Sequence, residues 1–390
     1  MSTLALSPAT TLPADGTAGT LVGRVFRPGL GPSVVAIRGD GVFDVTAAFA
    51  TTSDLFDTAS PAAAIAAVPG ERVGDLAAIL ANSAPDEHDA TKPHLLSPID
   101  LQAVKAAGVT FAISMVERVI EEQAKGVPER AAAIRGEIGD IIGGELKGLK
   151  PGSPEAAALK KHLQERGLWS QYLEVGIGPD AEIFTKAPVL SSVGTGADVG
   201  IHPISTWNNP EPEVVLVISS AGRIVGATLG NDVNLRDVEG RSALLLGKAK
   251  DNNASASLGP FVRLFDATFG IDAVRTMKVS LKVTGDDGFV LDGRSDMAAI
   301  SRDVEDLARQ AIGPHHQYPD GLVLYCGTLF APVQDRGDAG KGFTHMVGDI
   351  VTIASDGLGS LTNRVRLSTD CPPWTEGIRS LMASLAARRG

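Results

Sequence analysis

The sequence is poor in cysteine, in basic residues and in long apolar runs. Its two cysteines, Cys326 and Cys371, form neither a disulfide framework nor a CxxC zinc motif, so we expect a reducing compartment. Lysine and arginine number 35 against 46 acids, which gives a net charge of −11, and no basic cluster is interleaved with aromatics. These features argue against nucleic acid as a partner. The chain also lacks a signal-like start and any apolar run longer than a strand, which predicts a cytoplasmic protein with no membrane partner.

The residues that are present have the balance of a globular protein with many loops. Of the 390 residues 44% are hydrophobic and 21% are charged, and 44 glycines are spread along the chain. Residues 21–45 alternate short apolar stretches with Gly and Pro, which predicts hairpins, and residues 61–80 have alanine-rich helical spacing. Residues 81–98 are polar and punctuated by proline. We therefore predict a small N-terminal α/β domain over residues 1–94 and a catalytic domain over residues 95–390.

The predicted catalytic domain changes character along its length. Residues 101–164 have helical patterns, with Pro128 at the start of one helix and Ser153 as the N-cap of the next. From Trp169 to the end, apolar runs of strand length alternate with Gly, Asn and Asp turns. We therefore expect a β-rich α+β fold in which strands dominate the catalytic domain.

Three acids near the middle of the chain have the spacing of metal ligands. Glu211 and Glu213 stand two apart at the head of a strand, so their carboxylates point to the same face. Asp232 follows the next apolar run, within the reach of a hairpin. A divalent cation would explain these adjacent like charges, because hard oxygen ligands suit Mg²⁺ or Ca²⁺. We expect Mg²⁺, with Mn²⁺ as an alternative ion. The alternative is a solvated strand face, and spacing alone leaves both interpretations open.

These residues resemble the pattern of the fumarylacetoacetate hydrolase family. PEPEVVLVI, GNDVNLRD and a lysine ten residues before the proline of LGP occur in the family's order, and LLSPID, GVTFAIS, IFTKAP, CGT and GDIVTIASDGLGSLTNRV extend the match over most of the chain. The resemblance implies a mixed β-sandwich or β-roll catalytic domain and a homodimer. It also implies a metal held by Glu211, Glu213 and Asp232, with Lys250 in catalysis beside the metal and Thr328 at the substrate.

One departure from the family pattern bears on the reaction. Where the hydrolases of the family have a catalytic histidine, at the end of GVTFAIS, this chain has Ser114, whereas the glutamate three residues later is kept as Glu117. Loss of the imidazole removes the group best suited to make hydroxide at neutral pH, which disfavours hydrolysis of a carbon–carbon bond. Removing water from a substrate needs no activated water. Without the family pattern, Glu117 would be interpreted as a solvated acid on a helix surface.

Further strings resemble the branch of 2-keto-3-deoxy-pentonate dehydratases within this family. They are WNNPEPEVVL, GNDVNLRDVEGRSALLLGKAKDNNAS, HQYPDG and GLWSQYLEVGIGPDAE. This resemblance implies a hydro-lyase of oxidative pentose catabolism, in the degradation of D-xylose or L-arabinose. Its substrate would be a 2-keto-3-deoxy-pentonate of the D-xylonate or L-arabinonate series, and its product 2,5-dioxopentanoate.

The expected chemistry divides the proton transfers between two residues beside the metal. We expect the metal to bind the 2-oxo acid, Lys250 to take a C3 proton, and Glu117, through Ser114 or a water, to assist loss of the C4 hydroxyl, with the two roles exchangeable. A nearby cation and partial burial would both lower the pKa of Lys250. Asn252 is expected to contact the substrate or to hold Lys250 in place. The alternatives are an acylpyruvate or diketo-acid hydrolase of the same family, and a sugar-acid-binding protein without catalysis.

Overall fold

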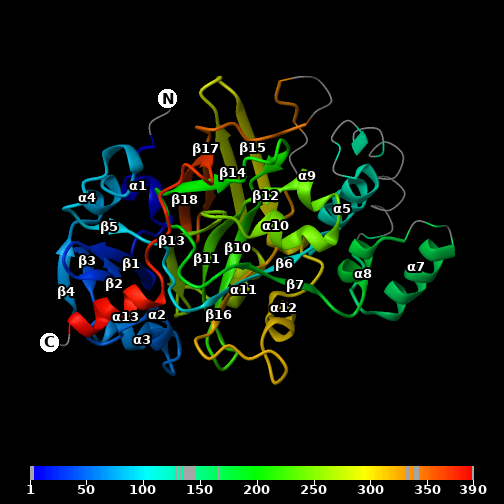
Figure 1. The fold of residues 1–390 in the computed structure, drawn as a ribbon. Helices are drawn as coiled ribbons and strands as arrows, with labels where there is room; N and C mark the ends of the chain where they lie inside the picture. The colour runs from blue at the N-terminus through cyan, green and yellow to red at the C-terminus, as the bar shows by residue number, and fades with distance from the viewer. Residues whose placement is uncertain are drawn as a thin grey trace.

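The computed structural model describes residues 4–125, 148–165, 169–330 and 342–388, together with residues 127, 130, 131, 134, 146, 167 and 334–337. In Figure 1 the N-terminal elements and the last helix lie on the left, strands fill the middle, and α5, α7 and α8 lie on the right. The predicted β-rich α+β class is confirmed. No helix in this part of the chain is long and apolar enough to cross a membrane.

The largest sheet in the described residues has eleven strands and joins the beginning of the chain to its middle. Its order is β4-β3-β2-β1-β13-β11-β10-β16-β6-β7, with β5 paired to β1. β1 lies antiparallel to β13, with Leu21 opposite Arg263, so the N-terminal strands continue the sheet of the later strands. The division into domains at residue 95 stays a prediction. The strands of this sheet are β1 (Leu21–Arg27), β2 (Gly31–Arg38), β3 (Gly41–Asp44), β4 (Glu71–Gly74), β5 (His94–Leu95), β6 (Ala103–Gly108), β7 (Glu182–Ala187), β10 (Pro212–Ile218), β11 (Ile224–Asp232), β13 (Ala256–Leu264) and β16 (Leu322–Tyr325).

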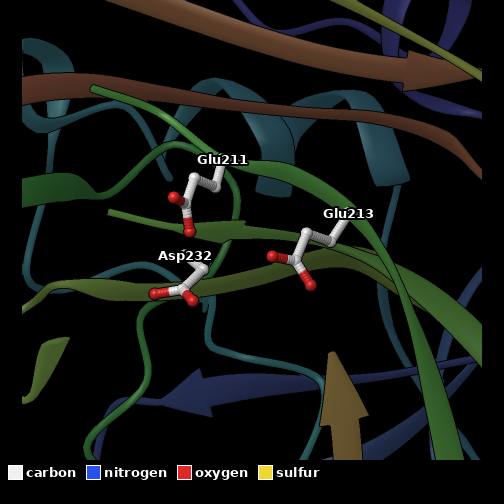
Figure 2. Close-up of side chains that lie close together, drawn as sticks. All are labelled: Glu211, Glu213 and Asp232. Atoms are coloured by element: carbon white, nitrogen blue, oxygen red, sulfur yellow. The ribbon is translucent and has the colours of Figure 1, made fainter. Parts of the chain in front are cut away.

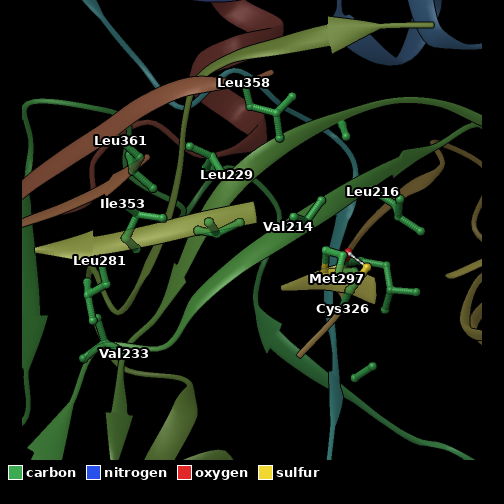
Figure 3. Close-up of a cluster of buried hydrophobic side chains, with 14 of the residues drawn as sticks. Val214, Leu216, Leu229, Val233, Leu281, Met297, Cys326, Ile353, Leu358 and Leu361 are labelled. Atoms are coloured by element: carbon green, nitrogen blue, oxygen red, sulfur yellow. Dashed lines mark hydrogen bonds between the residues drawn. The ribbon is translucent and has the colours of Figure 1, made fainter. Parts of the chain in front are cut away.

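A second sheet packs against the middle of the first, and the main core lies between them. Its order is β15-β14-β17-β18-β8. Leu216 of β10 shares one buried cluster with Leu281 and Ile353 of this second sheet (Figure 3), whereas the alternate residues Val215 and Val217 belong to a cluster on the other face. Because β10 is buried on both faces, each of these side chains contributes roughly 1.5–3 kcal/mol and fixes the strand firmly. The strands are β8 (Asp198–Ile201), β14 (Lys278–Thr284), β15 (Val290–Asp296), β17 (Ile350–Ser355) and β18 (Gly359–Leu367), and β9 (Asn208–Asn209) pairs separately with β12 (Asn234–Leu235).

The longest of the described helices is α5, Ala112–Ala124, whose Met115, Val119 and Ile120 are buried in a cluster of their own with residues of α8. Helix α7 begins at Pro154 as predicted, and the Ser153 hydroxyl accepts from the Ala156 amide at 3.1 Å. The helix predicted from Pro128 lies mostly outside the described residues. The other helical segments are α1 (Pro8–Thr11), α2 (Thr52–Phe56), α3 (Pro61–Ala66), α4 (Leu76–Ala81), η1 (Pro85–Glu87), α7 (Pro154–Glu165), α8 (Gln171–Ile177), α9 (Arg236–Glu239), η2 (Ala243–Leu245), α10 (Leu246–Lys250), α11 (Ile271–Arg275), η3 (Met297–Ala299), α12 (Val304–Ala311) and α13 (Ile378–Ala387).

One stretch that was predicted to be helical is a strand. Residues Ala103–Gly108 form β6, which lies parallel to β16, with Val104 opposite Val323, and antiparallel to β7. Alanine and lysine favour a helix locally, but pairing on both sides satisfies the backbone and buries Val104 completely. Tertiary pairing therefore outweighs the local preference, and it brings the end of β6 to the site described next.

Candidate metal centre

Three carboxylates meet where two paired strands come together (Figure 2). In the β10–β11 hairpin Glu213 lies opposite Gly230, and the Asp232 amide donates to the Glu211 carbonyl at 3.0 Å. Glu211, Glu213 and Asp232 each offer one oxygen, these oxygens all lie within 4.8 Å of one another, and all three residues are buried. The structure therefore brings the three predicted ligands together, and a solvated strand face is not what they form.

Positive groups contact two of the three acids. Arg118 donates to Oε1 of Glu211 at 2.6 Å, and Nζ of Lys250 donates to Oε2 of Glu211 at 2.5 Å. Lys250 also donates to Oδ2 of Asp232 at 3.0 Å, and Nζ of Lys186 lies 2.9 Å from Oδ1 of Asp232. Lys250 thus bridges two of the three predicted ligands.

The surroundings of the third acid differ from those of the other two. Glu213 accepts from the Gly327 amide at 2.6 Å, and Gly327 takes a positive φ of 87° in the CGT loop. Burial, followed by the charges of Asp232 and Glu211, raises the pKa of Glu213 well above its usual range. For Asp232 burial acts in the same direction, but Lys186 and Lys250 outweigh it and lower the pKa. A buried carboxylate with a raised pKa takes up either a proton or a cation.

The donor set fits a divalent cation. Every ligand atom that the triad offers is a carboxylate oxygen, and hard oxygen ligands suit Mg²⁺. Five acids and two bases line the same pocket, which with every group ionised is an excess of three negative charges, and a divalent cation would offset two of them. The chemistry of these residues therefore matches the predicted magnesium site. The acids are Glu182, Glu211, Glu213, Asp232 and Glu239, and the bases are Arg118 and Lys250.

The pocket beside the triad contains three of the other predicted site residues, Ser114, Lys250 and Thr328. The Thr328 hydroxyl accepts from the Phe330 amide at 3.1 Å, which leaves its own proton free to donate to a ligand. The Ser114 hydroxyl donates to the Phe111 carbonyl at 2.8 Å, so its proton is already used within the first turn of α5. Thr328 can therefore donate to a substrate, whereas Ser114 can accept from one.

Two predicted site residues do not line this pocket. Glu117 of α5 is buried, and its Oε2 lies 3.6 Å from Nη2 of Arg236, so it is neither a solvated surface acid nor a group in the pocket. The Asn252 side chain donates to the Lys248 carbonyl at 3.0 Å. Asn252 thereby satisfies the backbone at the end of α10, which takes its amide away from the expected substrate contact.

The pKa of Lys250 moves opposite to the expectation. Burial lowers it, as expected, but the charges of Asp232 and Glu211 outweigh burial and raise the pKa above the usual value for lysine. The expected lowering assumed that a cation would be the nearest charge. In this structure two carboxylates hold the ammonium instead, and the same contacts keep it protonated.

Glu182 of β7 is a pocket residue that sequence reasoning did not single out. It pairs with Gly108 of β6, and a Cβ at Gly108 would lie 2.1 Å from Oε2 of Glu182, so the glycine leaves room for this carboxylate. Burial, and then the charge of Glu239, raise the pKa of Glu182 from 4.5 to about 7. A value near neutrality suits proton transfer. The residue stands next to the IFTKAP motif, but a single glutamate at a strand start carries no pattern of its own.

Lys186 is a second residue whose importance only the fold reveals. It is completely buried behind Asp232, where Nζ donates to the Val233 carbonyl at 3.1 Å and to the Lys250 carbonyl. The hydroxyl of Ser255 lies 3.2 Å from the same nitrogen. Lys186 therefore ties a predicted metal ligand to the backbone of the predicted catalytic lysine, and IFTKAP, in which it lies, was the only signal for it.

In comparisons with known sequences, the chain matches one family model and is similar to two proteins named as dehydratases. The family model described as "Fumarylacetoacetate (FAA) hydrolase C-terminal" matches residues 155–366, more than half of the chain. A protein of Haloferax volcanii named "Probable 2-keto-3-deoxyxylonate dehydratase" is 27% identical over 333 residues, which are 85% of this chain and 94% of that protein. The 2-dehydro-3-deoxy-D-arabinonate dehydratase of Saccharolobus solfataricus is 29% identical over 185 residues, which are 47% of this chain and 58% of that protein.

Comparison with solved structures supports the same fold. A 2-keto-3-deoxy-D-arabinonate dehydratase complexed with magnesium and 2,5-dioxopentanoate superposes with a TM-score of 0.62 at 21% identity, over 89% of this chain and 99% of that one. The fold predicted from the resemblance is therefore confirmed.

Proposed function

This chain belongs to the fumarylacetoacetate hydrolase family, and we propose that it is a metal-dependent dehydratase that converts a 2-keto-3-deoxy-pentonate to 2,5-dioxopentanoate and water. The observation that carries the proposal is one pocket in which three oxygen ligands, Glu211, Glu213 and Asp232, meet two titratable groups, Lys250 and Glu182. Relatives that are named for dehydration of such acids support it.

The composition of the pocket favours elimination over hydrolysis. Among the described residues that line it there is no histidine, and Ser114 stands where the hydrolases of the family have theirs. Without an imidazole beside the substrate, a water molecule has no evident base to activate it at neutral pH. A dehydratase needs only a base for a carbon-bound proton and an acid for the leaving hydroxyl.

Glu211, Glu213 and Asp232 would hold the cation. A cation held there would polarise the 2-oxo acid and would offset the carboxylate charge that raises the pKa of Lys250. Lys186 keeps Asp232 ionised, and the Gly327 amide orients Glu213. These neighbours fix the ligands before the substrate arrives, so little reorganisation is required during the reaction.

Lys250 and Glu182 divide the proton transfers. Lys250 takes one C3 proton, and protonated Glu182 gives a proton to the C4 hydroxyl, which leaves as water while a C3–C4 double bond forms. A proton shift from C5 to C3 then gives an enol, which becomes the C5 aldehyde. We assign the acid to Glu182 in place of Glu117 because Glu182 lines the pocket and Glu117 does not.

The substrate that we propose has the D configuration at C4. Oxidation at C2 and loss of the C3 oxygen leave C4 as the only stereocentre, so the D-xylonate and D-arabinonate series give the same 2-keto-3-deoxy acid. The relative from Saccharolobus solfataricus is named for the D-arabinonate series. The L-arabinonate series, which the sequence left open, differs from this compound only at C4.

The test is an assay of the purified protein with Mg²⁺ against both C4 epimers of 2-keto-3-deoxy-pentonate and against an acylpyruvate, with 2,5-dioxopentanoate measured by NMR. We expect turnover of the D epimer, slower turnover of the L epimer, and loss of activity with EDTA or in Glu213→Gln. Cleavage of the acylpyruvate alone would favour the hydrolase alternative. Binding of the D epimer without turnover would favour the sugar-acid-binding protein.

A further inference from the structure

Arg118 of α5 bridges three carboxylates that lie on α5 itself, on α9 and beside β10. Its Nη1 donates to Oε2 of Glu121 and to Oε2 of Glu239, each at 2.7 Å, and its Nη2 donates to Oε1 of Glu211 at 2.6 Å. The side chain is 14% exposed and lines the same pocket as the three metal ligands. One guanidinium therefore connects a predicted metal ligand to two neighbouring helices.

A second arginine anchors α5 independently of the metal ligands. Arg236 of α9 donates from Nε to Oε1 of Glu121 at 2.7 Å, and its guanidinium lies over the Trp207 ring at 4.2 Å. Glu121 thus receives one arginine on each of its oxygens, and α5 stays tied to α9 through Arg236. Arg118 is the link from this anchored helix to Glu211.

The two oxygens of Glu211 lie in different surroundings. Oε1 accepts from Arg118 and from Nδ2 of Asn234 at 3.1 Å, and both donors come from side chains that packing holds in place. Oε2 accepts from Lys250, whose ammonium also reaches Oδ2 of Asp232. Because the Lys250 ammonium contacts both oxygens, Oε2 of Glu211 lies near Oδ2 of Asp232. The donors to Oε1 fix the rotation of the Glu211 carboxylate that places Oε2 there.

We propose that Arg118 is a positioning residue that aims Oε2 of Glu211 at the cation and thereby couples cation binding to the placement of α5. The inference rests on the metal centre of the proposed function. A cation that favours this orientation of Glu211 also favours the position of the arginine that sets it, and the coupling is reciprocal. Since α5 carries Ser114, cation binding would also order one wall of the substrate pocket.

The experiment measures Mg²⁺ affinity by calorimetry and hydrogen exchange of residues 112–124 with and without Mg²⁺, in the wild type, Arg118→Met and Arg118→Lys. The matched control is Arg275→Met, because Arg275 also bridges three carboxylates, Asp303, Asp272 and Glu305, but does so away from this pocket. We expect Mg²⁺ to slow exchange in α5 of the wild type and of the control. In Arg118→Met the affinity should fall by about 10–100-fold, as for other residues that orient ligands, and saturating Mg²⁺ should no longer protect α5.

Arg118→Lys keeps a positive charge, but its ammonium cannot contact three carboxylates at once, so it should give an intermediate Mg²⁺ affinity. If circular dichroism shows that Arg118→Met is unfolded, Arg118→Lys tests the proposal in its place. Unchanged Mg²⁺ affinity in both variants, or protection of α5 that survives both substitutions, overturns the proposal. If the wild type binds Mg²⁺ but turns over none of the three substrates, the proposed function fails while these readouts still decide the role of Arg118. A wild type that binds no Mg²⁺ overturns both.

Discussion

Glu182 is a pocket residue whose protonation changes near neutral pH. Burial and Glu239 bring its pKa to about 7, so as the general acid it loses its proton when the pH rises through that value. We predict that kcat/KM of the wild type declines above about pH 7, and that Glu182→Gln lowers kcat by about 10²–10⁴-fold and removes this decline. Glu122→Gln, on α5 beside Ser170 and Gln171, is the control. An unaltered pH–rate profile in Glu182→Gln would refute the assignment.

The same raised pKa makes Glu182 a source of pH-dependent stability. An unperturbed glutamate titrates near 4.5 and Glu182 in the folded chain near 7, so between these values the folded chain keeps a proton that the unfolded chain has lost. The contribution is complete below pH 4.5 and is lost as the pH rises through 7. In EDTA, we expect the Tm to fall less between pH 5 and pH 7 in Glu182→Gln than in the wild type, as measured by calorimetry.

Removal of the Lys186 ammonium should lower the stability of the folded chain. Lys186→Met removes the ammonium beside Oδ1 of Asp232 and the side-chain donor to the carbonyls of Val233 and Lys250. Breaking a buried ion pair by deleting one partner typically costs about 3–5 kcal/mol, which we expect as the loss in the free energy of unfolding measured in urea. Lys278→Met, at an exposed position of β14, is the control and should change stability little. A loss no larger than that of the control would contradict the role given to Lys186.

The site residues that the sequence predicted are those whose geometry is local. Glu211 and Glu213 share a face because they are two apart on one strand, and Asp232 reaches them through a hairpin. Glu182 reaches the same pocket through the pairing of β6 with β7, and Arg118 reaches it through the placement of α5. A single residue in the sequence does not indicate such long-range contacts. Glu117, by contrast, was inferred from a motif, and the turn of α5 directs it toward Arg236.

At the level of elements, the end of β6 sets the space that the pocket acid occupies. In Gly108→Ala the added methyl would lie 2.1 Å from Oε2 of Glu182, so this carboxylate must shift. We expect kcat to fall by at least about tenfold, since misplacement of a catalytic group by 1 Å can cost 10²-fold, while the Tm changes little. Gly74→Ala, at the end of β4, meets nothing within 4 Å and is the matched control. Equal kcat in both variants would argue against Glu182 as a reacting group.

The less an element depends on distant partners, the better the sequence predicts it. The β10–β11 hairpin and the start of α7 at Pro154 follow from local apolar runs, turn residues and a serine cap. β6 was predicted to be helical because its alanines and lysine favour helix, and only the distant β16 and β7 make it a strand. Register across such long separations cannot be derived from one sequence.

For the molecule as a whole, binding of the cation should appear as a gain in stability. A ligand that binds only the folded chain stabilises it by about 2.7 kcal/mol at 100 times its Kd. We therefore expect the Tm to rise with Mg²⁺ concentration and the rise to disappear in Glu213→Gln, as measured by differential scanning calorimetry. The Arg275→Met variant should keep the full rise. A wild-type Tm that does not change with Mg²⁺ concentration would contradict the metal centre.

The homodimer, the division into domains at residue 95 and the cytoplasmic location stay predictions. Light scattering of the purified protein tests the homodimer.

The last described helix packs against an early strand. Helix α13 lies against β2, and Arg388 donates to the carbonyls of Leu30 and Pro32 and to the hydroxyl of Ser33. β1 also depends on β13, which is made much later. During synthesis the first strands leave the ribosome long before these partners exist, so their packing must wait until β13 and α13 have emerged. Slow translation of the residues that form β13 and α13 would therefore prolong the time for which these early strands are exposed to chaperones and proteases.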